Sequence, residues 1–188
     1  VLIINNLIEA RELPTNKFYY FKNESKLVPH DVIIFIGDEQ PVADKAYEFA
    51  DSIADVARRF NTERVYTFAA MAIPMHHKDR SGVWGTATDR KLLEELKLFD
   101  VKLFGGGHIA GMNGSLLGIA KKKGLDAICL LGEIPIYVVQ FGMEYPKASL
   151  AVLEIFSQIM EISLDTSELE LLGIQSEKEL DNLFEKLR

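Results

Sequence analysis

Short apolar runs alternate with longer segments of helical periodicity along most of the chain. The runs are rich in Val, Ile, Leu and Phe, which is typical of buried strands. The segments between them place apolar residues three and four positions apart, which predicts amphipathic helices. We expect strands at 32–37, 65–71, 101–105 and 126–133, a fifth candidate strand at 136–142, and helices at 41–60, 88–99, 113–124 and 146–162. This order predicts an α/β fold in which helices cover both faces of a sheet.

The two ends of the chain depart from this alternation. The apolar segment 1–6 and the aromatic segment 18–21 are expected to add edge strands or a hairpin. Toward the C-terminus, Ser-Glu-Leu-Glu at 167–170 and Ser-Glu-Lys-Glu at 176–179 are both capping boxes. Two short helices are therefore expected there.

The C-terminal segment 165–188 also differs in charge. It holds seven acidic and three basic residues, hence a net charge of −4 out of −7 for the whole chain. We predict a boundary here, with an α/β domain over 1–164 and an acidic helical appendage over 165–188. The appendage carries an apolar stripe that either packs on the domain or contacts a partner. The residues of this stripe that we expect at an interface are Leu180, Leu183, Phe184 and Leu187.

Composition narrows the class of protein. The chain has 188 residues, of which 48% are hydrophobic, and this is a globular composition. Its negative charge opposes binding to nucleic acid, and no apolar run approaches the roughly 18 to 20 residues of a membrane span. The single cysteine, Cys129, excludes an internal disulfide and is expected to lie buried in a strand. We expect a cytoplasmic protein that binds neither nucleic acid nor membranes.

A glycine-rich block at 102–124 is the most unusual stretch of the sequence. Gly105, Gly107 and Ala110 follow the dinucleotide-binding spacing G-x-G-x-x-A between a predicted strand and a predicted helix. However, the helix is expected to begin only at Asn113 or Ser115, too late to direct its N-terminus at a phosphate. The glycines either permit close packing or bind a phosphate or small ligand, and both alternatives stay open. The lysines at 121–123 suit the solvated C-terminus of a helix.

Polar residues near predicted strand ends are the candidates for ligand binding, because open α/β sheets bind ligands there. Glu133 can act as a base or ribose ligand, or cap the next turn. His76 and His77 are adjacent and lack metal-site spacing, so a solvated loop or an interface is favoured over a metal. We expect no catalytic residue, no metal and no cofactor, because no complete set of converging groups is visible. The candidate ligand-binding residues are Gly105, Gly106, Gly107, His108, Asn113 and Glu133.

The segment 71–89 reads as a long loop with unusual apolar content. It contains Met75 and Trp84, and such residues are enriched in the cores of protein interfaces. We expect these two residues to contact another subunit or a partner protein.

Three stretches together carry a resemblance to a known family. They are VIIFIGDEQP at 32–41, LFGGGHIAGMNGSLLGIAKKKGLDAICLLGEIP at 103–135 and YPKASLAVLEIF at 145–156. In this order, over roughly residues 1–162, the chain resembles the archaeal branch of the proteasome assembly chaperone family. The resemblance implies a three-layer α/β/α sandwich with a mostly parallel central sheet, related in fold to purine nucleoside phosphorylases.

The resemblance also implies a function. Members of the family bind proteasome α-subunits and help the α-ring to assemble, usually as homo-oligomers and without established catalysis. Some carry a C-terminal hydrophobic-Tyr-any tail that docks between α-subunits. This sequence ends Lys-Leu-Arg and has no tyrosine after Tyr145, so either the tail lies beyond it or this member binds differently. The alternative is a small-molecule enzyme, phosphorylase-like or nucleotide-dependent, with its site at the glycine-rich strand end.

Overall fold

The computed structural model describes residues 2–9, 14–23 and 30–186. The chain divides into two compact units, Val1–Val42 and Ala43–Arg188. The boundary that the sequence predicts at 164/165 lies within the second unit and stays a prediction.

The first unit consists of two antiparallel strand pairs. Strands β1 (Leu2–Ile4) and β2 (Leu7–Glu9) are joined by Asn5 and Asn6, which both have positive φ angles, of 51° and 65°. Asparagine tolerates this conformation better than most residues, and it favours a tight hairpin turn. The hairpin expected near the N-terminus is therefore confirmed.

The second strand pair of this unit joins β3 (Asn16–Phe21) to β4 (Val32–Gly37). Phe18 lies opposite Phe35 across the pair, and their ring centroids are 5.0 Å apart. Both segments were predicted as strands. The pairing between them is antiparallel.

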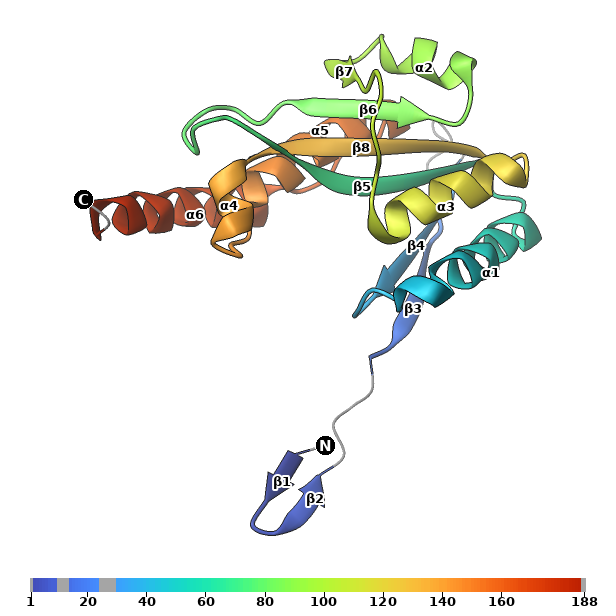
Figure 1. Cartoon of the computed structure of the whole chain (residues 1–188). Helices are drawn as coiled ribbons and strands as arrows, with labels where there is room; N and C mark the ends of the chain where they lie inside the picture. Colours follow the sequence, from blue (N-terminus) through green and yellow to red (C-terminus); the bar gives the residue numbers. More distant parts are fainter. Residues whose placement is uncertain (1, 10–13, 24–29, 187–188) are drawn as a thin grey trace. The chain divides into compact units, whose positions relative to one another are not determined.

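The second unit contains a four-stranded sheet in the order β5-β8-β6-β7 (Figure 1). Strands β5 and β8 are parallel, as are β6 and β7, while β6 runs antiparallel to β8. The mostly parallel sheet expected for this α/β fold is thus confirmed. The strands are β5 (Arg64–Ile73), β6 (Val83–Ala87), β7 (Val101–Leu103) and β8 (Asp126–Pro135).

Helices cover both faces of this sheet. Figure 1 shows α3 in front of the strands and α5 behind them, and both helices pack on β8. Helix α1 packs on α3, and α6 packs on α5. The helices of this unit are α1 (Ala46–Arg59), α2 (Arg90–Leu96), α3 (Gly111–Lys122), α4 (Ile136–Gln140), α5 (Pro146–Met160) and α6 (Ser167–Lys186). This arrangement confirms the three-layer α/β/α sandwich.

The core of the second unit lies between β8, α2 and α5. Leu92 and Leu96 of α2 pack with β8 and with the buried face of α5, and each is 1% exposed. Cys129 of β8 is fully buried, and its burial raises the pKa of its thiol. The prediction of a buried cysteine on a strand is confirmed.

Helix ends show one confirmed and one corrected prediction. Gly124 has a φ of +70° directly after α3, as expected for a helix C-cap. The helix predicted to start at residue 88 starts at Arg90, and its cap is Asp89, whose carboxylate accepts a hydrogen bond from the Lys91 backbone N–H at 2.7 Å. Thr88 instead accepts a hydrogen bond from the Ala127 backbone N–H at 2.9 Å, which ties the end of β6 to β8.

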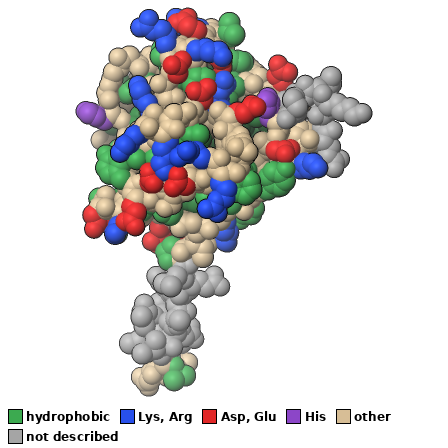
Figure 2. Space-filling view, turned by 90° about the vertical axis from the view of Figure 1, so that its right-hand side faces the viewer, with side chains coloured by type: hydrophobic (Ala, Val, Ile, Leu, Met, Phe, Trp, Pro, Cys, Tyr) green, Lys and Arg blue, Asp and Glu red, His purple; other side chains and the backbone are tan. Residues whose placement is uncertain are grey.

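The lysines at the end of α3 are not equivalent. The side chain of Lys123 is 15% exposed, and its ammonium group forms ion pairs with Asp51 and Asp55 of α1. The expectation of a fully solvated lysine is therefore wrong for this residue, and right for the exposed Lys121 and Lys122. Figure 2 shows one side of the molecule, on which Lys and Arg side chains are interspersed with Asp and Glu side chains.

Three predicted elements differ from the structure. The candidate strand at 136–142 is helix α4, whose only buried side chain is Val138. Part of the predicted long loop is strand β6. The two short C-terminal helices are one continuous helix, α6, with Gly173 and Ser176 on its buried face. No helix in the described part of the chain is long and apolar enough to cross a membrane.

Candidate functional site

Glu133, near the carboxyl end of β8, is held by three hydrogen bonds. Its carboxylate accepts from the Trp84 indole N–H at 2.6 Å, the Gly82 backbone N–H at 2.9 Å and the Lys102 ammonium at 2.6 Å. These donors belong to β6, to the loop before β6 and to β7. Glu133 is 4% exposed, and its carboxylate links β8 to β6 and to β7 beyond it.

The protonation state of Glu133 follows from these contacts. Burial raises its pKa, but the hydrogen bonds from Lys102, Trp84 and Gly82 outweigh burial and hold the pKa below its ordinary value of 4.5. A Cβ at position 82 would lie 2.6 Å from Oε2 of Glu133, so only glycine fits there without a shift. The partners of Glu133 lie on β6, on β7 and in the loop before β6 rather than in the next turn, and a role as base or ligand stays a prediction.

The glycine-rich block divides into an open part and a packed part. Gly105 and Gly106 are exposed, and a Cβ at either would meet no atom within 4 Å. Gly107 has a φ of +142°, and a Cβ there would lie 2.7 Å from the Phe104 ring. His108 is exposed. Glycine is thus required by the backbone at one of these three positions, and ligand binding by residues 105–108 stays a prediction.

The packed part lies at the start of α3. The Asn113 side-chain amide donates a hydrogen bond to the Phe68 carbonyl of β5 at 2.7 Å. A Cβ at Gly114 would lie only 1.8 Å from the Ile109 carbonyl oxygen. Helix α3 begins at Gly111, earlier than predicted, because this close approach lets the chain turn directly into the helix. Asn113 and Glu133 therefore make separate structural contacts.

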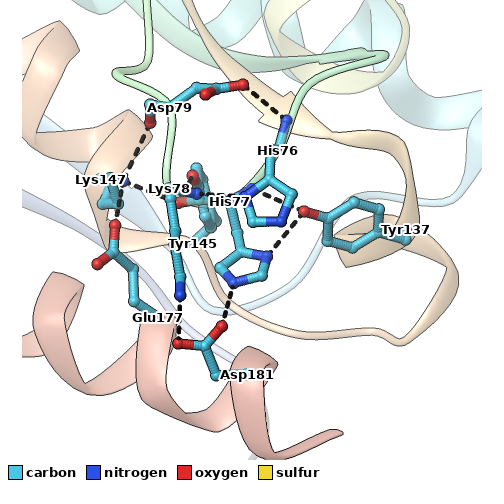
Figure 3. A network of polar contacts seen from close by, with 9 residues as sticks. All are labelled: His76, His77, Lys78, Asp79, Tyr137, Tyr145, Lys147, Glu177 and Asp181. Carbon is cyan, nitrogen blue, oxygen red and sulfur yellow. Dashed lines mark hydrogen bonds and ion pairs between the residues drawn. The ribbon is translucent and has the colours of Figure 1, made fainter. Parts of the chain in front are cut away.

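A polar cluster that the sequence did not predict surrounds His77, in the loop between β5 and β6. His77 is 1% exposed. Figure 3 shows its ring between Tyr137 of α4 and Asp181 of α6. The Nδ1 atom lies 3.0 Å from the Tyr137 hydroxyl oxygen, and Nε2 lies 3.0 Å from Oδ1 of Asp181. One imidazole ring thus connects a loop and two helices.

In the tautomer that carries its proton on Nε2, both ring nitrogens of His77 have a hydrogen-bond partner. The His77 backbone N–H donates to the Tyr137 oxygen at 2.7 Å. The hydroxyl proton of Tyr137 is then directed to Nδ1, which leaves Nε2–H to donate to the Asp181 carboxylate. Burial raises the pKa of Tyr137, so the phenol stays protonated at neutral pH.

Further contacts attach α6 to the same loop. The His77 carbonyl accepts from the Tyr145 hydroxyl at 3.0 Å and from the Lys147 ammonium at 2.8 Å. Lys147 also forms an ion pair with Glu177 of α6 (Figure 3). Lys78 pairs with Asp181 at 2.9 Å. The hydrogen bond from Lys78, and then the one from His77, lower the pKa of Asp181.

The expectation of a solvated loop holds for the exposed His76 but needs correction for His77. The His76 and His77 rings stack with centroids 4.2 Å apart, and His77 is buried within its own chain rather than solvated. Its partners Tyr137 and Asp181 lie 60 and 104 residues away in sequence, so no local spacing could reveal them. The sequence drew attention to this loop only through its unusual apolar content, which does not identify the partners of His77.

The residues predicted to lie at an interface differ in their burial and in their contacts. Trp84 is half-buried. Its indole N–H donates a hydrogen bond to Glu133, and the centroid of its ring lies 5.5 Å from the Lys102 ammonium. Leu180 is fully buried against Val138, Tyr145 and Ala148. The residues of this set that are partly exposed are Met75, Leu183 and Phe184, while Leu187 lies outside the described residues.

Apolar side chains that were not among the predicted interface residues are more exposed to solvent. On α6 these are Leu171, Leu172 and Ile174, which are 68%, 42% and 52% exposed. On α4, Val139 is 58% exposed. Part of the outward apolar surface of this unit therefore lies on α4 and on the first half of α6, while Tyr47, Phe60 and Leu98 are exposed elsewhere in the unit.

Comparison with models of known protein families shows the family to which this chain belongs. The model of the PAC2 family matches residues 1–183. The chain belongs to the PAC2 family. This confirms the resemblance seen in the sequence, because the solved structures similar to this chain include an archaeal homolog of proteasome-assembly chaperone.

Two solved structures from Pyrococcus furiosus are similar to this PAC2 chain over nearly its whole length. One is PbaB, an archaeal proteasome activator, with 29% identity and a TM-score of 0.80, over 97% of this chain and 75% of that one. The other is PbaA, an archaeal homolog of proteasome-assembly chaperone, with 29% identity and a TM-score of 0.75, over 99% and 71%.

A third relative is an uncharacterized protein of Methanocaldococcus jannaschii. It is 29% identical over 163 residues, which is 85% of this PAC2 chain. The chain spans 59% of the length of that relative.

Proposed function

We propose that this chain acts as a proteasome assembly chaperone-like protein, which binds proteasome α-subunits and assists α-ring assembly as a homo-oligomer and without catalysis. The observation that carries the proposal is the likeness to PbaA and PbaB, at 29% identity over nearly the whole chain. At this level the likeness covers sequence as well as fold, and it supports a shared class of partner.

The structural contacts of the polar side chains also support a binding role. Glu133, Asn113 and His77 are the polar side chains best placed for chemistry, and each holds elements of the fold together. A catalytic set needs groups that converge on a reacting atom. In contrast, a binding protein needs stable elements that present a surface.

The outward apolar residues of α6 offer such a surface. Leu171 and Ile174 lie one turn apart on the side of α6 opposite to the buried Gly173, Ser176 and Leu180. Exposed apolar side chains that gather on one face are typical of protein contact sites. We propose that this face contacts the α-subunit or a second copy of the chain.

An α-ring assembly assay tests this proposal. Purified α-subunit is incubated with limiting amounts of the wild-type chain, and ring formation is followed by native gel and electron microscopy. We expect the wild type to raise the yield of rings, and a variant lacking residues 165–188 to lose this effect.

A second variant separates binding from folding. Leu171→Ser with Ile174→Ser changes exposed side chains only, so α6 stays attached through Leu180 and the His77 cluster. We expect this variant to lose most of the assembly effect while its circular dichroism spectrum is unchanged. Full activity of both variants would refute the role given to α6, and no effect of the wild type would refute the proposed function.

A further inference from the structure

A cavity of about 650 Å³ opens beside the His77 cluster. Three separate elements form its wall, namely the loop after β5, helix α4 and the C-terminal half of α6. Nothing in the fold or in the proposed α6 contact face requires this hollow. The residues that line it and that matter for its chemistry are His76, Lys78, Tyr137, Asp181, Phe184 and Glu185.

Aromatic rings form the apolar part of the wall and hold one another in place. The Phe184 ring lies parallel to the His77 ring, with centroids 5.7 Å apart and an angle of 8°. Tyr137 meets Phe184 edge to face, with centroids 5.0 Å apart and an angle of 89°. Phe141 adds a further edge contact to Phe184 at 6.4 Å. Ring faces carry negative partial charge, so an aromatic wall of this kind attracts cations.

The charged groups at the rim are not balanced. Among the described residues that line the wall, Lys78 is the only Lys or Arg, and its ammonium pairs with the Asp181 carboxylate at 2.9 Å. Glu185 is exposed and forms no ion pair within 4 Å in the described part of the chain, although the contact with Asp181, and then the charges of Glu177 and Glu185, raise the pKa of Lys78. Helix α6 as a whole holds six acidic and two basic residues. The rim therefore keeps a net negative charge.

We propose that this cavity binds an arginine side chain presented by a partner protein. The aliphatic stem and planar guanidinium lie against Phe184 and Tyr137, and the charge is directed to Glu185. Arginine fits better than lysine because its flat, weakly hydrated guanidinium stacks on ring faces. The inference does not depend on which protein presents the arginine.

A pair of small probes tests the proposal directly. N-acetyl-arginine amide is titrated into the isotopically labelled chain, and amide chemical shifts are followed by NMR. N-acetyl-citrulline amide is the matched control, because it has the same shape and no charge. We expect arginine to shift the amides around Lys78, Tyr137 and Phe184 and to bind about three- to tenfold more tightly than citrulline.

Three variants locate the interaction. Glu185→Gln removes the unpaired charge at the exposed rim, and Phe184→Leu removes the ring face. We expect each to weaken arginine binding about three- to tenfold, with amide shifts outside the cavity unchanged. Glu179→Gln alters a carboxylate of α6 that is outside the cavity wall, and should bind like the wild type.

Three results would overturn the proposal. The first is equal binding of the arginine and citrulline probes, and the second is no shift at the cavity residues with either probe. The third is an equal loss of binding in Glu179→Gln and Glu185→Gln, which would indicate general attraction to an acidic helix. Because the probes contain no proteasome subunit, these results leave the proposed function to its own test.

Discussion

Replacing Glu133 by glutamine should destabilise the second unit and change the environment of its tryptophan. Glu133→Gln keeps the shape of the side chain but removes its charge and turns one acceptor oxygen into a donor NH₂ group. The carboxylate now accepts from Trp84, Gly82 and Lys102 at 2.6 to 2.9 Å. The amide oxygen of glutamine can keep some of these donors, but its NH₂ group faces at least one of them.

The size of the effect follows from burial. A hydrogen bond to a charged group contributes about 1.5–3 kcal/mol, and a buried group left unpaired costs about 1–3 kcal/mol. Glu133 is 4% exposed, so these interior values apply to its contacts with Trp84 and Gly82. The Lys102 side chain is 55% exposed, so its ion pair adds at most about 1 kcal/mol. We expect Glu133→Gln to lower the free energy of unfolding by about 2–4 kcal/mol.

Urea unfolding followed by tryptophan fluorescence measures this loss. Trp84 is the only tryptophan of the chain, and its indole N–H is itself bonded to Glu133. The control is Glu94→Gln, which changes an exposed carboxylate paired with Lys97. We expect this control to lose no more than about 0.5 kcal/mol.

The pH dependence gives a second check. The pKa of Glu133 is held below 4.5 in the folded chain, so its stabilising effect is complete well above pH 4.5. The effect is lost as the pH falls below that value through the lowered pKa. The advantage of the wild type over Glu133→Gln should therefore shrink in acid. An equal urea midpoint for Glu133→Gln and Glu94→Gln at neutral pH would refute the structural role of Glu133.

Two further changes test the packing of α3 and α6, both measured by urea unfolding. Gly114→Ala should destabilise by more than about 2 kcal/mol because its Cβ would meet the Ile109 carbonyl at 1.8 Å. The exposed Gly118 of the same helix has open space, so Gly118→Ala should stabilise by about 0.5–1 kcal/mol. If both lower stability equally, the close contact is not decisive. Leu180→Ala should cost about 2–5 kcal/mol and speed hydrogen exchange in α6, whereas Leu171→Ala, 68% exposed, should change little. Equal effects of these two would contradict the docking of α6.

The sequence predicted the elements whose pattern matches their burial. Helix α5 and strand β8 are examples, since apolar periodicity and a continuous apolar run place them correctly. Segment 136–142 failed because its β-branched residues favour a strand. Tertiary packing overrides this preference, since Tyr137 and Phe141 stand one helical turn apart in the aromatic cluster.

Glycine and serine misled the prediction in two other places. Segment 71–89 was predicted as a loop, but its Gly85 lies in β6, where a Cβ would meet Val101 at 2.7 Å and Leu96 at 2.9 Å. Ser176 suggested a helix start, but it lies mid-helix and donates to the Glu144 carbonyl at 3.2 Å. In both cases the small residue serves close packing between elements, which a single sequence does not reveal.

The candidate site was predicted less well than the fold. Glu133 was singled out, but its partners Trp84 and Lys102 come from other strands. The His77 cluster joins residues up to 104 positions apart, and only tertiary structure brings them together. Polar contacts of this range depend on which elements become neighbours, and local periodicity does not contain that information.

The most direct test of the account is binding to the proteasome α-subunit. The chain is analysed by size-exclusion chromatography with light scattering, alone and mixed with purified α-subunit from the same source. We predict a new, larger peak of fixed stoichiometry that contains both proteins. Two unchanged peaks, at concentrations where the α-subunit is soluble and folded, would contradict the proposed function.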